Sequence, residues 1–236
     1  MCGEEGVPRV VRENTANNLA CEHCNATLRY RAQASAIVSH FGSGQYASLK
    51  EARAAGVLDN LAVWEMALRG PIRRQFFGIE GYVPSYYWPD LPLGATRDGV
   101  VCQDVTALTF ADSSFDLVIS SDVMEHVHEP WAGFAEIARV LKPGGMNVFT
   151  IPVRIPLKPE SVTRATLDTD TGEVTHILPE VYHQSGELEP SLVFTDFGAD
   201  IFERHRELGM HLSFHRASTR SRADSRFGTF VAVKLG

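Results

Sequence analysis

The stretch that decides the fold is Val101–Val153, VCQDVTALTFADSSFDLVISSDVMEHVHEPWAGFAEIARVLKPGGMNVFTIPV. Within it, Phe115–Ser121 is mostly apolar and is bounded by Ser and Asp, which is typical of a buried strand. Apolar residues recur at helical spacing in Pro130–Leu141, and this helix ends at Lys142–Gly145, because proline cannot continue it and glycine permits positive φ. Met146–Val153 has the pattern of a second buried strand. This order predicts a βαβ unit in a parallel sheet.

Length and composition set the class of protein. A chain of 236 residues favours one large domain, and a net charge of −7 argues against binding to nucleic acid or to an anionic membrane. We find no apolar run long enough to span a bilayer, and the polar N-terminus does not resemble a signal peptide. Four cysteines in a chain of this length do not suggest a disulfide framework, so we expect a cytoplasmic protein.

A Cys-x-x-Cys pair, Cys21 and Cys24, stands near the N-terminus. Such a pair can be half of a zinc site, but a complete site needs two further ligands. Cys2, His23 or His40 could supply them, and the spacing selects none of the three. The alternative is a structural turn without metal, so the sequence leaves zinc binding open.

We divide the chain into an N-terminal segment, residues 1–58, and a domain, residues 59–236. The pattern predicts two helices in the first part and two strands at the start of the second. These are helices at Arg29–Phe41 and Tyr46–Ala55 and strands at Leu61–Met66 and Phe76–Glu80.

The second half of the domain departs from this alternation. Residues 154–190 contain several prolines and a hairpin signal around Asp170–Gly172, which predicts an insertion that covers the ligand side of the sheet. An amphipathic helix at Asp196–Leu208 and strands at His211–His215 and Gly228–Leu235 follow.

The central stretch resembles the second half of a class I S-adenosylmethionine-dependent methyltransferase domain of the methyltransferase type 11 group. The resemblance implies a doubly wound, Rossmann-like α/β sheet of seven strands, mostly parallel, with an antiparallel C-terminal edge. It also implies S-adenosylmethionine as the cofactor and a small-molecule methyl acceptor as the partner. The residues that carry the resemblance are Asp104 with Leu108 and Phe110, Ser114–Val118, Glu125 with His126, and Ala138–Gly145.

In the resembling family an acid and a glycine-rich loop follow the first strand, where missing side chains let the backbone approach the cofactor. Here Glu65 stands at the position of the acid, Ala67 at the first glycine position, and Gly70 supplies one free backbone position. Arg69 and Pro71 depart from the family pattern. The resemblance therefore implies a cofactor loop of modified shape.

Four more residues are implied in cofactor binding. Glu80, at the expected end of the second strand, is predicted to accept hydrogen bonds from the ribose diol. Asp104 is implied to accept a hydrogen bond from the adenine amino group, while the Val105 amide meets a ring nitrogen. Ser121 ends the fourth strand at the ligand edge of the sheet.

Catalytic candidates follow that strand and lie in the insertion. Asp122, Glu125 and His126 are expected at the reaction mouth, where His126 could take a proton from a hydroxyl or amine nucleophile. The alternative is that Glu125 and His126 only orient the loop. In the insertion, His183 belongs to a turn beside the predicted active face and is a further candidate.

The functional hypothesis is methyl transfer from S-adenosylmethionine to a small-molecule O, N or C nucleophile. The alternative is a non-catalytic protein on the same fold that binds S-adenosylmethionine or a partner, because a fold alone does not establish a function. The modified loop at Ala67–Pro71 motivates this alternative.

Overall fold

The structure is a computed structural model that describes residues 1–3, 9–10, 19–66, 68, 70–153, 156–183, 190–216 and 228–236. The four predicted helices lie close to their expected positions, whereas α3 and η1 were not predicted. The helices are α1 (Leu28–Phe41), α2 (Leu49–Ala54), α3 (Arg73–Phe76), α4 (Pro130–Val140), α5 (Asp200–Glu207) and the 3₁₀ turn η1 (Met124–His126). Ser48 caps α2 by accepting a hydrogen bond from the Glu51 amide.

A main sheet of eight strands runs in the order β15-β16-β8-β7-β3-β4-β6-β5. The inner pairs are parallel, and the pairs that involve β15, β16 and β5 are antiparallel. This confirms the predicted α/β class with its antiparallel C-terminal edge, and β5 adds one strand to the seven expected. The strands are β3 (Val63–Met66), β4 (Tyr82–Tyr86), β5 (Thr96–Arg97), β6 (Val100–Cys102), β7 (Phe115–Ser121), β8 (Leu141–Thr150), β15 (Met210–Arg216) and β16 (Gly228–Lys234).

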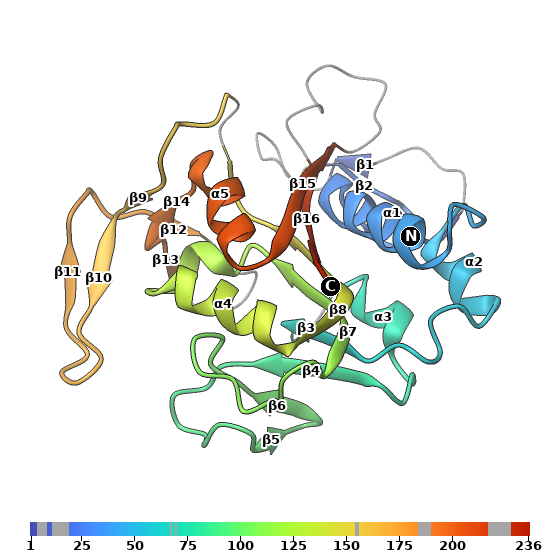
Figure 1. Cartoon of the computed structure of the whole chain (residues 1–236), viewed down its shortest axis with the longest axis horizontal. Helices are drawn as coiled ribbons and strands as arrows, with labels where there is room; N and C mark the ends of the chain where they lie inside the picture. Colours follow the sequence, from blue (N-terminus) through green and yellow to red (C-terminus); the bar gives the residue numbers. More distant parts are fainter. Residues whose placement is uncertain are drawn as a thin grey trace.

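Helices cover both faces of this sheet (Figure 1). On one face α4 and α5 bury Phe134 and Ile201 in a cluster with Phe149 of the sheet. On the other face α1, α2 and α3 bury their apolar side chains in a second cluster with Val63 and Val148. The N-terminal segment therefore shares its core with the domain that follows it.

The predicted strand at Phe76–Glu80 is wrong. Phe76 ends the short helix α3, Gly78 has a φ of +83°, and the second strand is β4, Tyr82–Tyr86. Proline is rare inside strands, so Pro84 argues against a strand in this aromatic segment. Its aromatic and β-branched neighbours nevertheless favour a strand, and β4 pairs with β3 in parallel register.

The predicted end of the helix and the predicted start of the next strand both differ from the structure. β8 begins at Leu141 rather than Met146, and its pairing with β7 is irregular between the Phe115–Leu141 and Leu117–Met146 partners. Gly144 has a φ of +76°, and a Cβ on Gly145 would lie 2.8 Å from the Lys142 carbonyl oxygen. Glycine is therefore required at both places for α4 to turn directly into β8.

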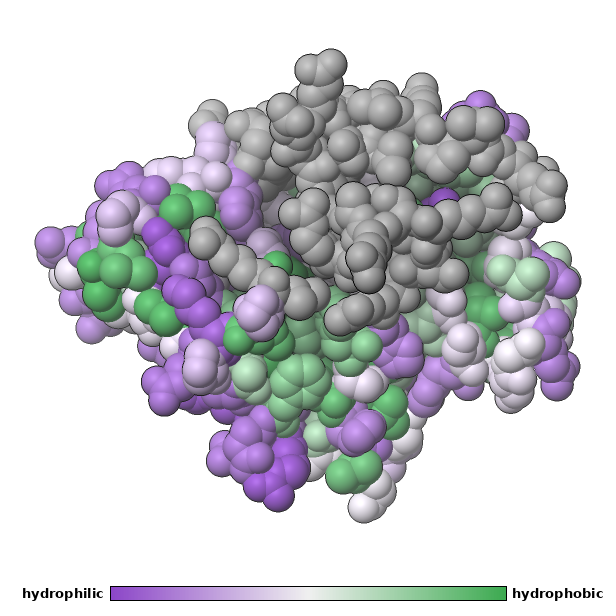
Figure 2. Space-filling view, turned by 90° about the horizontal axis from the view of Figure 1, so that it is seen from above, coloured by the Kyte–Doolittle hydropathy of each residue, from purple (hydrophilic) through white to green (hydrophobic). Residues whose placement is uncertain are grey.

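The insertion forms the predicted hairpin, which projects from one end of the molecule (Figure 1). Figure 2 shows hydrophobic side chains among hydrophilic ones at this end, and Ile177, Val181 and Tyr182 are exposed apolar residues of the insertion.

Among the described residues no helix is long and apolar enough to cross a lipid bilayer. The small paired strands are β1 (Arg9–Val10) with β2 (Leu19–Ala20), β10 (Ala165–Leu167) with β11 (Val174–His176), β12 (Tyr182–His183) with β13 (Ser191–Leu192), and β9 (Val162–Thr163) with β14 (Thr195–Asp196).

Substitution of Phe149 tests the core. This ring is fully buried and stacks on Phe230 with centroids 5.2 Å apart. Phe149→Ala is expected to lower the free energy of unfolding by about 3–5 kcal/mol, because it removes apolar contacts and leaves a cavity. Urea denaturation measures the change. Phe77→Ala, at a side chain that is 68% exposed, is the matched control, and equal losses in both variants would contradict this assignment of the core.

Candidate active site

The candidate site lies where the sheet changes its winding direction. From β3 the chain passes through α3 to β4 on one side, whereas β7 pairs with β3 on its other side. In open parallel sheets ligands bind at such a switch point, outside the carboxyl ends of the strands. The turn after β3 and the residues after β7 therefore face the same crevice.

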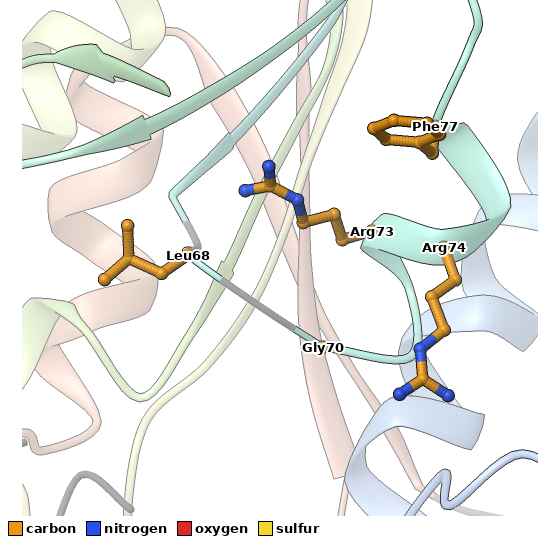
Figure 3. A pocket seen from close by; sticks show the side chains of 5 residues that line it. All are labelled: Leu68, Gly70, Arg73, Arg74 and Phe77. Carbon is orange, nitrogen blue, oxygen red and sulfur yellow. The ribbon is translucent and has the colours of Figure 1, made fainter. Parts of the chain in front are cut away.

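The turn after β3 borders a pocket for which five of the described residues form the lining (Figure 3). Leu68 and Gly70 come from the turn itself, and Gly70 has a φ of +155°, which side-chain-bearing residues rarely adopt. Arg73, Arg74 and Phe77 line the other wall, and Figure 3 shows the two arginine side chains extending in different directions. Ala67 and Arg69, two positions of the predicted cofactor loop, lie outside the described residues.

Glu65 is buried in β3, one residue before its end. Only 4% of the residue is exposed, and the Tyr82 hydroxyl donates a hydrogen bond of 2.6 Å to its carboxylate. Burial raises the pKa of Glu65 to about 7, although this hydrogen bond and the charge of Arg73 oppose the increase. Glu65, which stands at the position of the acid in the resembling family, is therefore hydrogen bonded to the neighbouring strand β4.

Asp104 and Val105 follow β6, at the carboxyl edge of the sheet. One Asp104 carboxylate oxygen accepts hydrogen bonds of 2.8 Å from both the amide and the hydroxyl of Thr106. Val105 is buried in the cluster under α4. The turn thus holds the Asp104 carboxylate in place and leaves its other oxygen outside this pair of bonds.

Glu80 does not lie where the sequence analysis placed it. It precedes β4, which runs parallel to β3 from Tyr82 to Tyr86, so Glu80 is exposed at the amino edge of the sheet. Asp104 lies at the carboxyl edge, because it follows β6 and β6 is parallel to β4. The two acids are therefore on opposite edges, and the structural basis for a ribose-binding Glu80 is wrong.

The residue that ends β4 is Tyr86, which the sequence analysis did not single out for the ribose. Its ring centroid lies 5.0 Å from that of Trp88, and its carbonyl accepts a hydrogen bond from the Gln103 amide beside Asp104. The sequence signal for Tyr86 is the aromatic segment around Pro84. If this segment is predicted as a strand, Tyr86 falls at the end of that strand.

The end of β7 is closed by α1. The Ser121 hydroxyl donates to the Gln33 side chain at 3.0 Å, and the Gln33 amide donates to the Ser120 carbonyl at 2.8 Å. Asp122 forms an ion pair with Arg29 and accepts a hydrogen bond of 2.7 Å from the Thr150 hydroxyl. A carboxylate with these two partners is poorly suited to act as a general base.

Glu125, His126 and His183 come together beside this edge. The Glu125 Oε1 atom lies 3.6 Å from His126 Nε2 and 3.5 Å from His183 Nδ1. The two imidazole rings are perpendicular, with centroids 5.1 Å apart. The tertiary structure thus joins the two candidate histidines through a carboxylate that is 1% exposed.

A third cysteine, Cys2, lies close to the Cys-x-x-Cys pair. The Cys2 sulfur lies 3.7 Å from that of Cys21, and the sulfurs of Cys2, Cys21 and Cys24 all lie within 4.8 Å of one another. Burial raises the pKa of Cys24 to about 11. Burial also acts to raise the pKa of the Cys21 thiol. Hydrogen bonds from the backbone of Cys24 and His23 outweigh the effect of burial and lower the pKa of Cys21 to about 7.

The raised pKa of Glu65 predicts a pH-dependent stability. The ordinary pKa is 4.5 and the folded value about 7, so the native state binds this proton more tightly and loses stability as pH rises through that interval. Glu65→Gln is expected to remove a pH-dependent term of about 3 kcal/mol between pH 5 and 8. Urea denaturation at both pH values measures it. Glu80→Gln, at an exposed acid, should keep the wild-type dependence, and a Glu65→Gln curve parallel to wild type would refute the assignment.

Part of the chain is similar in sequence to known proteins. Residues 92–149 match the family model described as a methyltransferase domain. An uncharacterized methyltransferase of Mycolicibacterium gilvum is 50% identical over 48 residues, which are 20% of this chain and 19% of the relative. Another, from Mycobacterium avium, is 51% identical over 47 residues, which are 20% and 19% of the two chains. These matches cover about a fifth of the length of the curated relatives.

Among solved structures, Streptomyces venezuelae DesVI aligns with a TM-score of 0.50 and 16% identity, over 87% of this chain and 92% of that chain. A likeness at this identity concerns the fold. The matched segment, 92–149, begins before β5 and includes β6, β7 and α4 and nearly all of β8, so it contains Asp104, Ser121 and His126. Residues 92–149 are therefore similar to a methyltransferase domain, and the chain as a whole shares the fold of DesVI.

Proposed function

We propose that the protein transfers a methyl group from S-adenosylmethionine to a small-molecule nucleophile. The observation that carries the proposal is the position of the matched segment. It contributes Asp104 with Val105 after β6, and Ser121 at the end of β7, to the edge of the sheet where open parallel sheets bind ligands. The net charge of −7 supports a small-molecule acceptor over a nucleic acid.

The described residues fit an adenosine at this edge. The Asp104 oxygen that is not engaged by Thr106 can accept from the adenine amino group, and the Val105 amide can donate to a ring nitrogen. At the end of β4 the Tyr86 hydroxyl stands in place of the usual ribose-binding acid. A hydroxyl can still hydrogen bond to a ribose, although it lacks the two acceptor oxygens of a carboxylate.

Methyl transfer from S-adenosylmethionine requires little chemical assistance from protein side chains. When bound, S-adenosylmethionine supplies a methyl group already activated on a sulfonium, so the chain contributes binding, alignment and exclusion of water. α1 closes the site at the end of β7 through Gln33 and Arg29. The insertion carries His183 to the mouth, where an acceptor would have to enter.

Asp104 and Glu80 form a matched pair for testing the cofactor site. Asp104→Asn keeps an oxygen for the Thr106 turn but weakens the acceptor for the adenine amino group. We expect it to raise the Kd for S-adenosylhomocysteine about tenfold, measured by isothermal titration calorimetry, which corresponds to about 1.4 kcal/mol. Glu80→Gln at the opposite edge should leave the Kd unchanged. No binding to the wild-type chain, or a loss only in Glu80→Gln, would overturn the proposal.

A non-catalytic role on the same fold is the second candidate. The departures at Arg69 and Pro71 and the tyrosine at the end of β4 favour it, because each changes a position that binds the cofactor in the resembling family. Calorimetry distinguishes the two when combined with a methylation assay over amine, hydroxyl and carbon acceptors. Saturable cofactor binding without a methylated product supports the non-catalytic role.

We also propose that Cys2, Cys21 and Cys24 hold a structural zinc ion with one further ligand. Their sulfurs lie within 4.8 Å of one another, and the lowered pKa of Cys21 favours the thiolate that zinc requires.

Elemental analysis of the purified chain tests this zinc site. Cys21→Ser is expected to remove one equivalent of zinc relative to wild type, because it deletes a thiolate ligand. Cys102→Ser, at a thiol that donates to the Trp88 and Leu91 carbonyls, is the matched control and should retain it. Equal zinc contents in the two variants would contradict the site.

A further inference from the structure

We propose that Glu125, His126 and His183 bind a divalent transition-metal ion that activates an oxygen nucleophile of the methyl acceptor. The metal site stands on the geometry of these three side chains. Its use on an acceptor rests on the proposed methyl transfer.

The spacing of the donor atoms matches ligands of one ion. The Glu125 Oε1 atom lies 3.6 and 3.5 Å from His126 Nε2 and His183 Nδ1, and all three donors lie within 4.8 Å of one another. Ligands about 2.1 Å from a tetrahedral zinc ion are about 3.4 Å apart. A direct hydrogen bond between these groups would be shorter, at about 2.7–3.2 Å.

The Glu125 side chain is buried beside the two imidazoles. The residue is 1% exposed, and neither carboxylate oxygen has a hydrogen-bond partner among the described residues. A buried carboxylate without partners is costly, and such groups are usually paired or coordinate a metal. Since its two neighbours are imidazoles beyond hydrogen-bonding distance, a cation between the three groups would satisfy this carboxylate.

The tautomer of His126 supports the same conclusion. Its Nδ1 atom lies 2.7 Å from the Leu192 carbonyl oxygen, which can only accept, so Nδ1 carries the proton. Nε2, which faces the Glu125 carboxylate, is then the ring nitrogen that is available to bind a cation. A histidine that donates one ring N–H to a backbone carbonyl is the usual arrangement in metal sites.

The insertion holds the third ligand in place. His183 is in β12, where it pairs with Ser191 of β13, and Leu192 of β13 orients His126. The Phe194 amide also donates to the Glu125 carbonyl at 2.8 Å. An ion at this point would therefore link the turn after β7 to the segment that covers the mouth.

Two imidazoles and one carboxylate are a ligand set typical of zinc and of related divalent transition metals. Three protein ligands leave a coordination position open, as in catalytic sites. A hydroxyl of the acceptor would occupy it and lose its proton to water, because the ion lowers the pKa of a bound oxygen. The oxygen pair then forms the C–O bond as the C–S bond of S-adenosylmethionine breaks, which releases S-adenosylhomocysteine.

The experiment uses the full chain with Cys21→Ser, so that the cysteine cluster does not bind zinc, after dialysis against a chelator. Isothermal titration with Zn²⁺ is expected to show one site, and His183→Ala and Glu125→Gln are expected to weaken it at least about tenfold, since each removes a ligand. His176→Ala is the matched control. This histidine belongs to the same insertion and also pairs with a glutamate, Glu180, at 3.3 Å.

Zn²⁺ binding that is absent from the parent chain, or equal in the parent and His183→Ala, would overturn the metal site. Calorimetry with S-adenosylhomocysteine on the same variants separates this outcome from failure of the proposed function. His183→Ala should bind S-adenosylhomocysteine like the parent, because His183 is not among the residues assigned to the cofactor. If wild type forms a methylated product, activity restored to the dialysed enzyme by Zn²⁺, but not to dialysed His183→Ala, supports the role on the acceptor.

Discussion

The candidate site depends on the parallel pairing of β3 with β7 in the middle of the sheet. Because β4 pairs with β3 on the opposite side, the chain leaves these two strands in opposite directions, and their carboxyl ends border one crevice. Because Met66 pairs with Ser120, the turn that contains Gly70 and the residues Ser121 and Asp122 leave the sheet at adjacent positions. Every assignment of a cofactor residue follows from which end of a strand the residue occupies.

Two segments outside the central stretch complete this edge. α1 comes from the N-terminal segment, and its Gln33 side chain bonds to the last two residues of β7. Its Arg29 side chain pairs with Asp122, which follows them. The insertion comes from the other side of the sequence and orients His126 through the Leu192 carbonyl. A fold shared by many enzymes thus receives its particular site from additions at both ends of the common unit.

Two buried glutamates, Glu65 and Glu125, have different surroundings in this molecule. Glu65 is satisfied by the Tyr82 hydroxyl, and burial raises its pKa so that it carries little charge below neutral pH. Glu125 is as deeply buried but has two imidazoles around it and no hydrogen bond to its oxygens among the described residues. The first arrangement stabilises a strand pair, whereas the second is suited to a cation.

The sequence by itself determined the elements whose signals are local. The strand at Phe115–Ser121, the helix that follows it and the two C-terminal strands are found at or near their predicted bounds, since hydrophobic periodicity and breakers define them. Only the tertiary structure decided which acid faces the crevice. β4 was missed because Pro84 obscures it, and a shift of this strand moved Glu80 to the opposite edge of the sheet. The cluster of Glu125, His126 and His183 and the approach of Cys2 to Cys21 join residues far apart in the chain, and no local pattern encodes such a distance.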